Sequence, residues 1–193
     1  PKRITISHVY SEDNKGDAAL LSVLLSDIKK VYPKAKLTIL TLDSVPVRHT
    51  FEGVPVKKSF MYYSLNKFRS RPMTLMNALF VMNTTAIWAY AKRTFGISIP
   101  LPKKLAEVCR IYKNSDLILP VGGGYLRSQK KGIGSLLNVG QLLHPYLIAS
   151  MLGKPTILYT QSVGPFASKP EKWLVKRVLN TCVAAAIIRE EVS

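Results

Sequence analysis

A doubly wound parallel α/β sheet is the fold class that this 193-residue sequence predicts. Short apolar runs rich in β-branched residues alternate with stretches whose apolar residues recur at helical spacing, which is typical of βαβ units. Pro and Gly breaks separate the runs. The length suits one sizeable domain with an ordinary core, because 47% of the residues are hydrophobic.

The first βαβ unit lies near the amino terminus. Residues 3–9 form an apolar β-branched run and predict a strand, and residues 17–31 carry leucines at helical spacing and predict a helix. Residues 36–41 follow a break at Pro33 and predict a second parallel strand. Residues 54–56 predict a short third strand.

The same rhythm returns in the second half of the chain. Residues 116–121 and 156–160 predict strands, and they are separated by a helical stretch over residues 134–152. Residues 171–182 predict another helix, and residues 183–188 predict a last strand. The last strand is so uniformly apolar that we expect it to be covered on both faces.

A basic and apolar insertion over residues 59–115 separates the two halves, and we expect it to be helical. Its residues 73–91 include no charge over 19 positions and have Lys or Arg on both sides. Spanning a bilayer would place the predicted strands on opposite sides of the membrane, which disfavours a transmembrane helix. A helix packed on the domain and a helix lying in an anionic lipid interface remain as alternatives that do not exclude each other.

Charge and cysteine content narrow the class of protein. The chain has 28 Lys and Arg against 11 Asp and Glu, a net charge of +17, which favours a polyanionic partner such as phospholipid, nucleic acid or a phosphorylated substrate. Cys109 and Cys182 form no metal-binding or disulfide pattern, so we expect a cytoplasmic protein without a metal or cofactor. Both chain ends look cut, and we expect a fragment.

Ligands of parallel α/β sheets bind at the carboxyl ends of strands, which directs attention to the loops that follow them. The first such loop, residues 11–17, contains Asn14, Gly16 and Asp17 just before a predicted helix. Gly16 lets the backbone approach a ligand, and the helix start offers N–H groups to an anion. Asp17 either caps that helix, which we favour, or acts in catalysis.

The second loop contains three consecutive glycines, Gly122, Gly123 and Gly124, followed by Arg127. Residues without a Cβ let backbone amides point at a phosphate or a sugar, and Arg127 adds a positive charge. The spacing matches neither the dinucleotide fingerprint nor the P-loop, so neither a dinucleotide enzyme nor an ATPase is indicated.

The third loop contains Gln161, Ser162, Gly164 and Pro165. No hydrolase elbow surrounds Ser162 and no histidine follows it, which argues against a catalytic triad. Ligand binding and a rigid Gly-Pro turn are the two roles left open for this loop.

The second and third loops lie in a purely cationic stretch. No carboxylate occurs between Asp116 and Glu171, whereas five Lys or Arg residues do. This favours a phosphate or carboxylate ligand over a metal site or paired-carboxylate chemistry. His8, at the end of the first strand, is a weak catalytic candidate beside the more common role of a satisfied buried histidine, and we interpret His144 as structural.

Five motifs resemble, in order and spacing, those of the polysaccharide pyruvyl transferases. They are NKGDAAL at 14–20, DLILPVGGGYL at 116–126, GKP at 153–155, QSVGPF at 161–166 and REEVS at 189–193. The resemblance covers nearly the whole chain. It implies a Rossmann-like domain that is the amino-terminal half of a two-domain, glycosyltransferase-B-like enzyme, with the second domain missing.

The resemblance also implies an activity, the transfer of a pyruvyl group from phosphoenolpyruvate to two hydroxyls of one sugar. The product is a cyclic ketal on a cell-envelope or exopolysaccharide precursor, and phosphate is released. Donor-binding basic residues and the catalytic His are implied for the missing half, so this fragment alone is expected to be inactive. Phosphoenolpyruvate is then a co-substrate, and the residues that would line the cleft are Asn14, Gly16, Asp17, Gly122, Gly123, Gly124, Gln161, Ser162, Gly164 and Pro165.

Two other functions remain as alternatives. One is a nucleotide-sugar glycosyltransferase of similar fold, because fold does not fix function. The other is a non-enzymatic basic module that binds lipid or nucleic acid, although the helical middle lacks interleaved Arg and aromatic residues and nucleic acid is not expected. The basic middle fits an enzyme that works peripherally at the inner face of an anionic membrane on a diphosphate-linked sugar.

Overall fold

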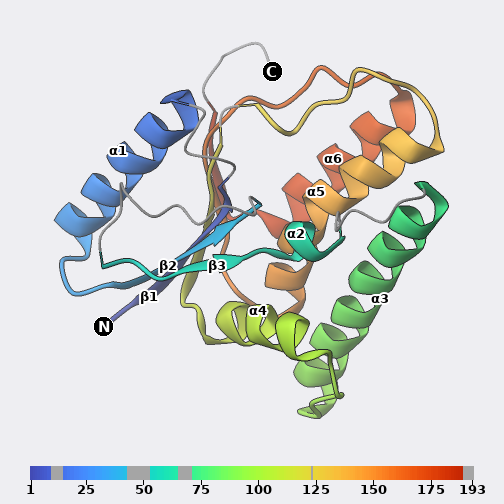
Figure 1. Ribbon diagram of the computed structural model, residues 1–193. Helices are drawn as coiled ribbons and strands as arrows, with labels where there is room; N and C mark the ends of the chain where they lie inside the picture. Colours follow the sequence, from blue (N-terminus) through green and yellow to red (C-terminus); the bar gives the residue numbers. More distant parts are fainter. Residues whose placement is uncertain (10–14, 43–52, 65–70, 123, 189–193) are drawn as a thin grey trace.

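The computed structural model describes residues 1–9, 15–42, 53–64, 71–122 and 124–188 (Figure 1). Strands and helices alternate along most of this length, except in the middle, where consecutive helices follow one another. In chain order the elements are β1 (Arg3–Val9), α1 (Lys15–Val31), β2 (Lys36–Thr41), β3 (Val56–Lys58), α2 (Phe60–Ser64), α3 (Arg71–Phe95), α4 (Lys103–Asn114), β4 (Leu117–Pro120), α5 (Ile133–Met151), β5 (Ile157–Gln161), α6 (Lys169–Cys182) and β6 (Ala185–Ile188).

The strands are parallel and follow the order β3-β2-β1-β4 in one sheet and β5-β6 in a second. Parallel bridges from Ile118 to Thr156 and from Val121 to Tyr159 connect the two sheets at β4 and β5. The resulting order β3-β2-β1-β4-β5-β6 reverses its direction between β1 and β4, as in Rossmann-like folds. The predicted parallel α/β fold is therefore confirmed.

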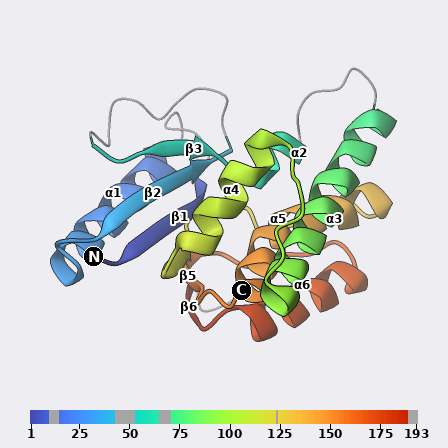
Figure 2. The same cartoon turned by 90° about the horizontal axis from the view of Figure 1, so that it is seen from below.

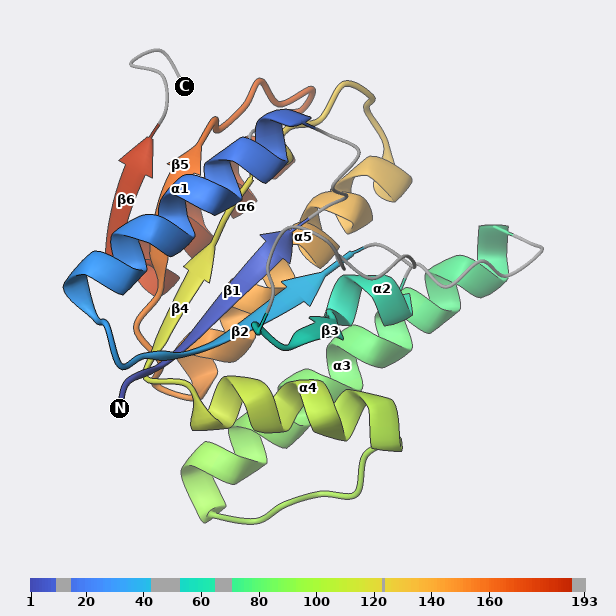
Figure 3. The same cartoon turned by 60° about the vertical axis from the view of Figure 1, so that its left-hand side comes forward.

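Helix α1 covers one face of the sheet, and Figure 3 shows it crossing in front of the strands while α5 and α6 lie behind them. Leu21, Leu25 and Ile28 of α1 share a buried cluster with Ile4 and Ile6 of β1. Apolar residues two apart on a strand point to the same face, which is why alternate residues of β1 meet α1.

The opposite face is covered by helices from the middle and the end of the chain (Figure 2). Tyr112 of α4, Ile118 of β4 and Ile148 of α5 belong to one buried cluster, which also contains Trp88 of α3. The predicted insertion over residues 59–115 is thus helical and packs on the domain, with α4 against β1 and with α2 and α3 against α5. No helix in the described part of the chain is long and apolar enough to cross a membrane.

Three sequence predictions need correction. β3 lies at 56–58 rather than 54–56, and α1 begins at Lys15 rather than at 17. β6 is not covered on both faces, since all four of its residues are exposed. It pairs with β5 along one edge at the end of the sheet order, and a continuous apolar run identifies a strand without showing what packs against it.

Candidate functional site

The loops that follow β4 and β5 run side by side at the carboxyl edge of the sheet. Leu126 forms a parallel bridge with Val163, and its carbonyl accepts a 2.8 Å hydrogen bond from the N–H of Gly164. The N–H of Ser128 donates to the Pro165 carbonyl at 3.0 Å. Two of the three loops singled out in the sequence therefore meet at one edge.

A bulge in β1 turns His8 away from the face that it would otherwise share with Ile4 and Ile6. The pairing register of β1 shifts between Ile6 and Val9, and His8 has a left-handed backbone with φ of 62°. Val9 joins the cluster under α1 in its place. His8 points to the opposite face, where its Nε2 donates to the Leu142 carbonyl of α5 at 2.9 Å.

A bulge in β5 has the same effect on Gln161. The register with β6 shifts between Tyr159 and Gln161, and Thr160 between them has φ of 50°. Regular alternation would place Gln161 with Tyr159 on the α1 side, but Gln161 accepts a hydrogen bond from Tyr146 of α5. In the described part of the chain, His8 and Thr160 are the non-glycine residues with positive φ, and such strain concentrates at functional sites.

The two bulges bring their side chains to one aromatic cluster, which we call the edge cluster: His8, Tyr125, Tyr146 and Gln161. The Tyr146 hydroxyl donates to Oε1 of Gln161 at 3.3 Å, so the Tyr125 hydroxyl, 2.8 Å away, donates to Tyr146. Burial raises the pKa of Tyr146, which keeps its hydroxyl protonated as a donor. The direction of this chain of hydrogen bonds is thereby fixed.

Gln161 carries the unused donor of the edge cluster. Its side chain is almost fully buried, and its Nε2 has no hydrogen-bond partner among the described residues. The same holds for Oγ1 of neighbouring Thr160. Buried polar atoms without a partner are costly, and these two lie together at one strand end.

His8 is neutral and has both ring nitrogens occupied. Since Nε2 donates to Leu142, Nδ1 accepts from the Ser7 hydroxyl at 3.1 Å. Burial lowers the pKa of His8 from 6.5 to about 4, against a smaller opposing effect of the hydrogen bond to Leu142. Its ring stacks on Tyr125 with 4.7 Å between centroids and 4° between planes. His8 therefore positions Tyr125, and no free lone pair remains for use as a base.

Gly122 ends β4 directly beside the edge cluster. A Cβ at this position would lie 2.8 Å from two ring carbons of Tyr125 and 3.6 Å from Nε2 of Gln161. Only a glycine allows the Tyr125 ring and the Gln161 amide to approach the backbone this closely. The close approach of Tyr125 therefore explains why position 122 is a glycine, which the sequence pattern alone did not show.

Ser128 and Glu171 fasten the two loops to the start of α6. The Ser128 hydroxyl donates to Oε2 of Glu171 at 2.7 Å and accepts from the N–H of Ala167 at 2.9 Å. Glu171 also accepts from the N–H of Ser168, completing a capping box. The hydroxyls of Ser135 and Ser128 lower the pKa of Glu171, which keeps this carboxylate ionised and in a structural role.

The structure places the remaining candidates as follows. Asn14 of the first loop and Gly123 of the second lie outside the described residues. Gly16 is exposed and Asp17 is half-buried, and both belong to the first turn of α1. Asp17 is thus the third residue of the helix and not its cap. In the first turn of the helix, the Asp17 carboxylate still interacts favourably with the positive end of the helix dipole.

Exposed and half-buried residues surround the edge cluster along its two loops. Arg127, Gly124, Ser162, Gly164 and Pro165 all lie in these loops, and the side chain of Arg127 is exposed. The described residues contain no group of three His, Cys, Asp or Glu side chains able to hold a metal ion.

His144 lies elsewhere, buried under α3, where Nε2 is 2.7 Å from the Thr85 hydroxyl. The sequence interpretation of His144 as structural agrees with this contact.

Tyr125, Tyr146 and Thr160 were not selected from the sequence. Tyr125 directly follows the glycines, so its position next to the loop was a usable signal. Tyr146 lies on α5, 15 positions before Gln161, and no spacing rule relates the two. Thr160 is a β-branched residue inside a strand pattern, which favours extended backbone and gives no sign of a left-handed turn.

The fold and the edge cluster define a Rossmann-like α/β protein whose hydrogen-bonding side chains gather at the carboxyl ends of β1, β4 and β5. A comparison with protein families matches residues 14–193 to polysaccharide pyruvyl transferase. Because the match covers most of the chain, the protein belongs to this family of transferases. None of the curated proteins compared matches the chain.

Proposed function

We propose that the carboxyl edge of the sheet binds phosphoenolpyruvate and a saccharide, and contributes to the formation of a pyruvyl ketal on the sugar. Family membership supports the reaction class. The unpartnered amide of Gln161, held between Gly122 and Tyr146, supports this edge as the place of binding. In the proposed enzyme, this chain forms the amino-terminal half of a glycosyltransferase-B-like architecture in the cytoplasm.

The reaction balances without a redox step. Two sugar hydroxyl oxygens form bonds to C2 of phosphoenolpyruvate, and the bond from C2 to the phosphate oxygen breaks. One hydroxyl proton ends on the methylene carbon, which becomes a methyl group, and the other is taken up by the released phosphate. Catalysis therefore requires cations for phosphate and carboxylate, a proton donor and a base.

The residues of this chain fit the binding part of that chemistry. Nε2 of Gln161 is a neutral donor for a carboxylate or hydroxyl oxygen, and its orientation is set by Tyr146. Arg127, Lys130 and Lys131 are exposed on the loop after β4, where they supply positive charge for a phosphate. Asp17, in the first turn of α1, is the carboxylate that would act as a base or as a positioning group for the sugar hydroxyls.

The test is a comparison of donors with the full-length protein. Incubation with phosphoenolpyruvate and candidate saccharides is expected to release phosphate and to add one pyruvate, less one water, to the acceptor mass. Release of a nucleotide from a nucleotide sugar, with no consumption of phosphoenolpyruvate, would instead establish a glycosyltransferase and overturn the proposal.

A pair of variants tests the edge itself. Gln161→Leu keeps the side-chain volume and removes the donor, and we expect kcat/KM for phosphoenolpyruvate or acceptor to fall about tenfold or more. Gln141→Leu serves as the matched control, because Gln141 is also a buried glutamine but lies on α5, outside the edge cluster. Equal kinetics of both variants and the parent, with melting temperatures unchanged, would remove Gln161 from the site.

A further inference from the structure

Helix α3 presents a large apolar surface to solvent on the side away from the core. Met73, Met76, Phe80, Ile87 and Tyr90 are each more than half exposed. Their spacing of three, four, seven and three places them along one side of the helix. We call these five residues the α3 apolar face. Apolar stripes of this size are unusual on a free surface and mark a place of contact.

The opposite side of α3 packs on the rest of the domain, and Trp88 is buried there. Ala78, Val81, Thr85 and Ala89 are buried, and they are small or short side chains that allow close packing on α5. The Thr85 hydroxyl also reaches His144 of α5. The orientation of α3 is therefore fixed by its packing, and the exposed face is a consequence of the folded structure.

Polar residues next to the α3 apolar face satisfy their hydrogen bonds within the helix. Thr84 Oγ1 donates to the Phe80 carbonyl at 2.6 Å, and Asn83 Nδ2 donates to the Leu79 carbonyl at 2.8 Å. Donors that are already paired with the helix backbone cost less to remove from water. This surface is thus suited to a medium that offers few hydrogen bonds.

The positive charge around α3 indicates what kind of partner contacts the α3 apolar face. The sequence has nine Lys or Arg residues and no Asp or Glu between Glu52 and Glu107. The exposed side chains of Lys103 and Lys104 begin α4. Lys92 and Arg93 add charge in the last turn of α3, where they also donate to the carbonyls of Gly96 and Ser150. A second copy of this chain would bring like charges together, whereas an anionic lipid surface complements them.

We propose that α3 lies in the surface of an anionic lipid bilayer, with the α3 apolar face inserted between headgroups and the basic residues on lipid phosphates. The helix would lie parallel to the membrane, because its opposite side packs on α5. Figures 1 and 2 both place α3 at the outer border of the molecule, away from α1, so the rest of the domain does not obstruct this contact. The proposal concerns binding and is independent of the reaction proposed above.

The test is flotation of the full-length protein with lipid vesicles. We expect binding to mixed phosphatidylglycerol–phosphatidylcholine vesicles that weakens with added salt, and little binding to phosphatidylcholine alone. Met76→Gln with Phe80→Gln is expected to weaken binding about tenfold or more, because two large apolar side chains no longer leave water. Val31→Gln with Trp173→Gln removes two exposed apolar side chains on α1 and α6 and is expected to bind like the parent.

A fluorescence measurement separates lipid from the other occupants. In a Phe80→Trp variant, brominated lipids are expected to quench the emission that this tryptophan adds to that of the parent. An added emission that vesicles leave unquenched would show that another part of the protein covers the face, and would overturn the proposal. So would a lipid-free dimer that Met76→Gln with Phe80→Gln dissociates, or equal vesicle binding by this variant and the parent.

Discussion

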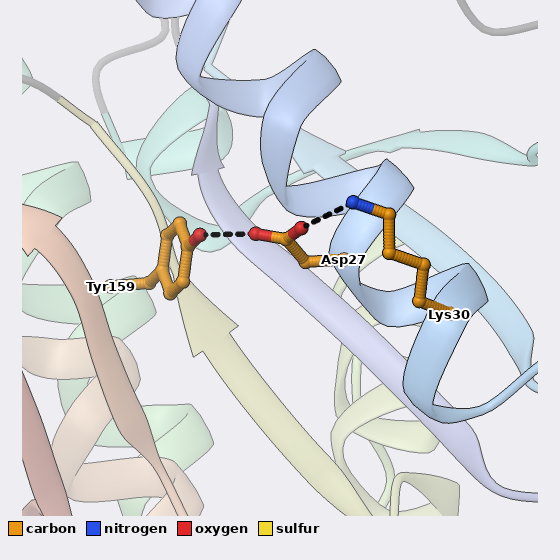
Figure 4. Close-up of polar contacts among 3 residues, drawn as sticks. All are labelled: Asp27, Lys30 and Tyr159. Carbon is orange, nitrogen blue, oxygen red and sulfur yellow. Dashed lines mark hydrogen bonds and ion pairs between the residues drawn. The ribbon is translucent and has the colours of Figure 1, made fainter.

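The Tyr159 hydroxyl donates a 2.9 Å hydrogen bond to Oδ2 of Asp27, joining strand β5 to helix α1 across the sheet face (Figure 4). The other carboxylate oxygen of Asp27 pairs with Lys30 at 3.4 Å. Partial burial and the Asp27 carboxylate raise the pKa of Tyr159, so its hydroxyl remains a donor. This contact fixes α1, whose first turn contains Gly16 and Asp17, relative to the strand that ends in Gln161.

Removing this hydrogen bond is expected to lower stability. Tyr159→Phe deletes only the donor, and we expect the free energy of unfolding to fall by about 1 kcal/mol, since the acceptor is charged but partly solvated. Asp27→Asn combined with Tyr159→Phe in a double-mutant cycle gives the coupling energy. Lys30→Ala is the control and should change stability by less than about 0.5 kcal/mol, because its ion pair is exposed. The measurement is urea unfolding. If Lys30→Ala lowered the free energy of unfolding more than Tyr159→Phe, the Tyr159–Asp27 hydrogen bond would not be the stronger of the two contacts.

Gly122→Ala is expected to disturb the edge cluster more than the fold. The added Cβ would meet the Tyr125 ring at 2.8 Å, so the ring must move and loses its stack on His8. We expect kcat/KM of the full-length enzyme to fall about tenfold or more, with a modest decrease in melting temperature. Gly132→Ala is the matched control, because its φ of 122° strains a side chain in the same way while a Cβ there meets nothing within 4 Å. Comparable activity of the two variants would show that Tyr125 need not occupy its present position.

Acid is expected to weaken the fold through two buried histidines. Burial lowers the pKa of both His8 and His144 from 6.5 to about 4. The unfolded chain therefore takes up protons first as the pH falls, so their contribution to stability is complete above about pH 6.5 and is lost toward pH 4. Each shift corresponds to a loss of up to about 3 kcal/mol over that window.

The histidine prediction is checked by urea unfolding at several pH values between neutrality and pH 4. His144→Asn cannot titrate, so the dependence of its unfolding free energy on pH should be shallower than that of the parent, whatever its absolute stability. An unchanged slope would mean that His144 is protonated in the folded protein without cost, contrary to its burial beside Thr85.

The sequence allowed the sheet to be predicted because β-branched and other apolar residues gather in short runs at β1, β2 and β4, whose observed bounds lie within a residue or two of the predicted ones. The meeting of the β4 and β5 loops followed from the same topology. The bulges were not predictable, because neither His8 nor Thr160 is a residue type that signals a left-handed backbone strongly enough to be singled out. Without the bulges, His8 and Gln161 would face α1, and no edge cluster would form.

The sequence also did not show which side of α3 is buried. An uncharged stretch gives no polar side from which to infer the buried one, and the usual expectation is that Met76 and Phe80 point inward. Close packing on α5 instead selects Ala78, Thr85 and Ala89 for the interior. Trp88 is buried on this side as well, so the packing of α3 and not a hydrophobic pattern decides which side is buried.

Ser128→Ala is expected to loosen the two loops of the site relative to each other. The Ser128 hydroxyl donates to the Glu171 carboxylate and accepts from the N–H of Ala167. It thereby connects the loop after β4 to both the loop after β5 and the first turn of α6. Loss of the buried hydroxyl is expected to lower the free energy of unfolding by about 1 to 2 kcal/mol.

Because Gly164 and Leu126 remain paired through their backbones, the loops should stay in place but move more. We therefore expect KM for phosphoenolpyruvate to rise more than kcat falls. Ser150→Ala on α5, whose carbonyl and not its hydroxyl is used by Arg93, provides the control. A variant at Ser128 that loses stability without any change in KM would show that the Ser128–Glu171 contact supports the fold alone and has no part in positioning the loops proposed to bind phosphoenolpyruvate.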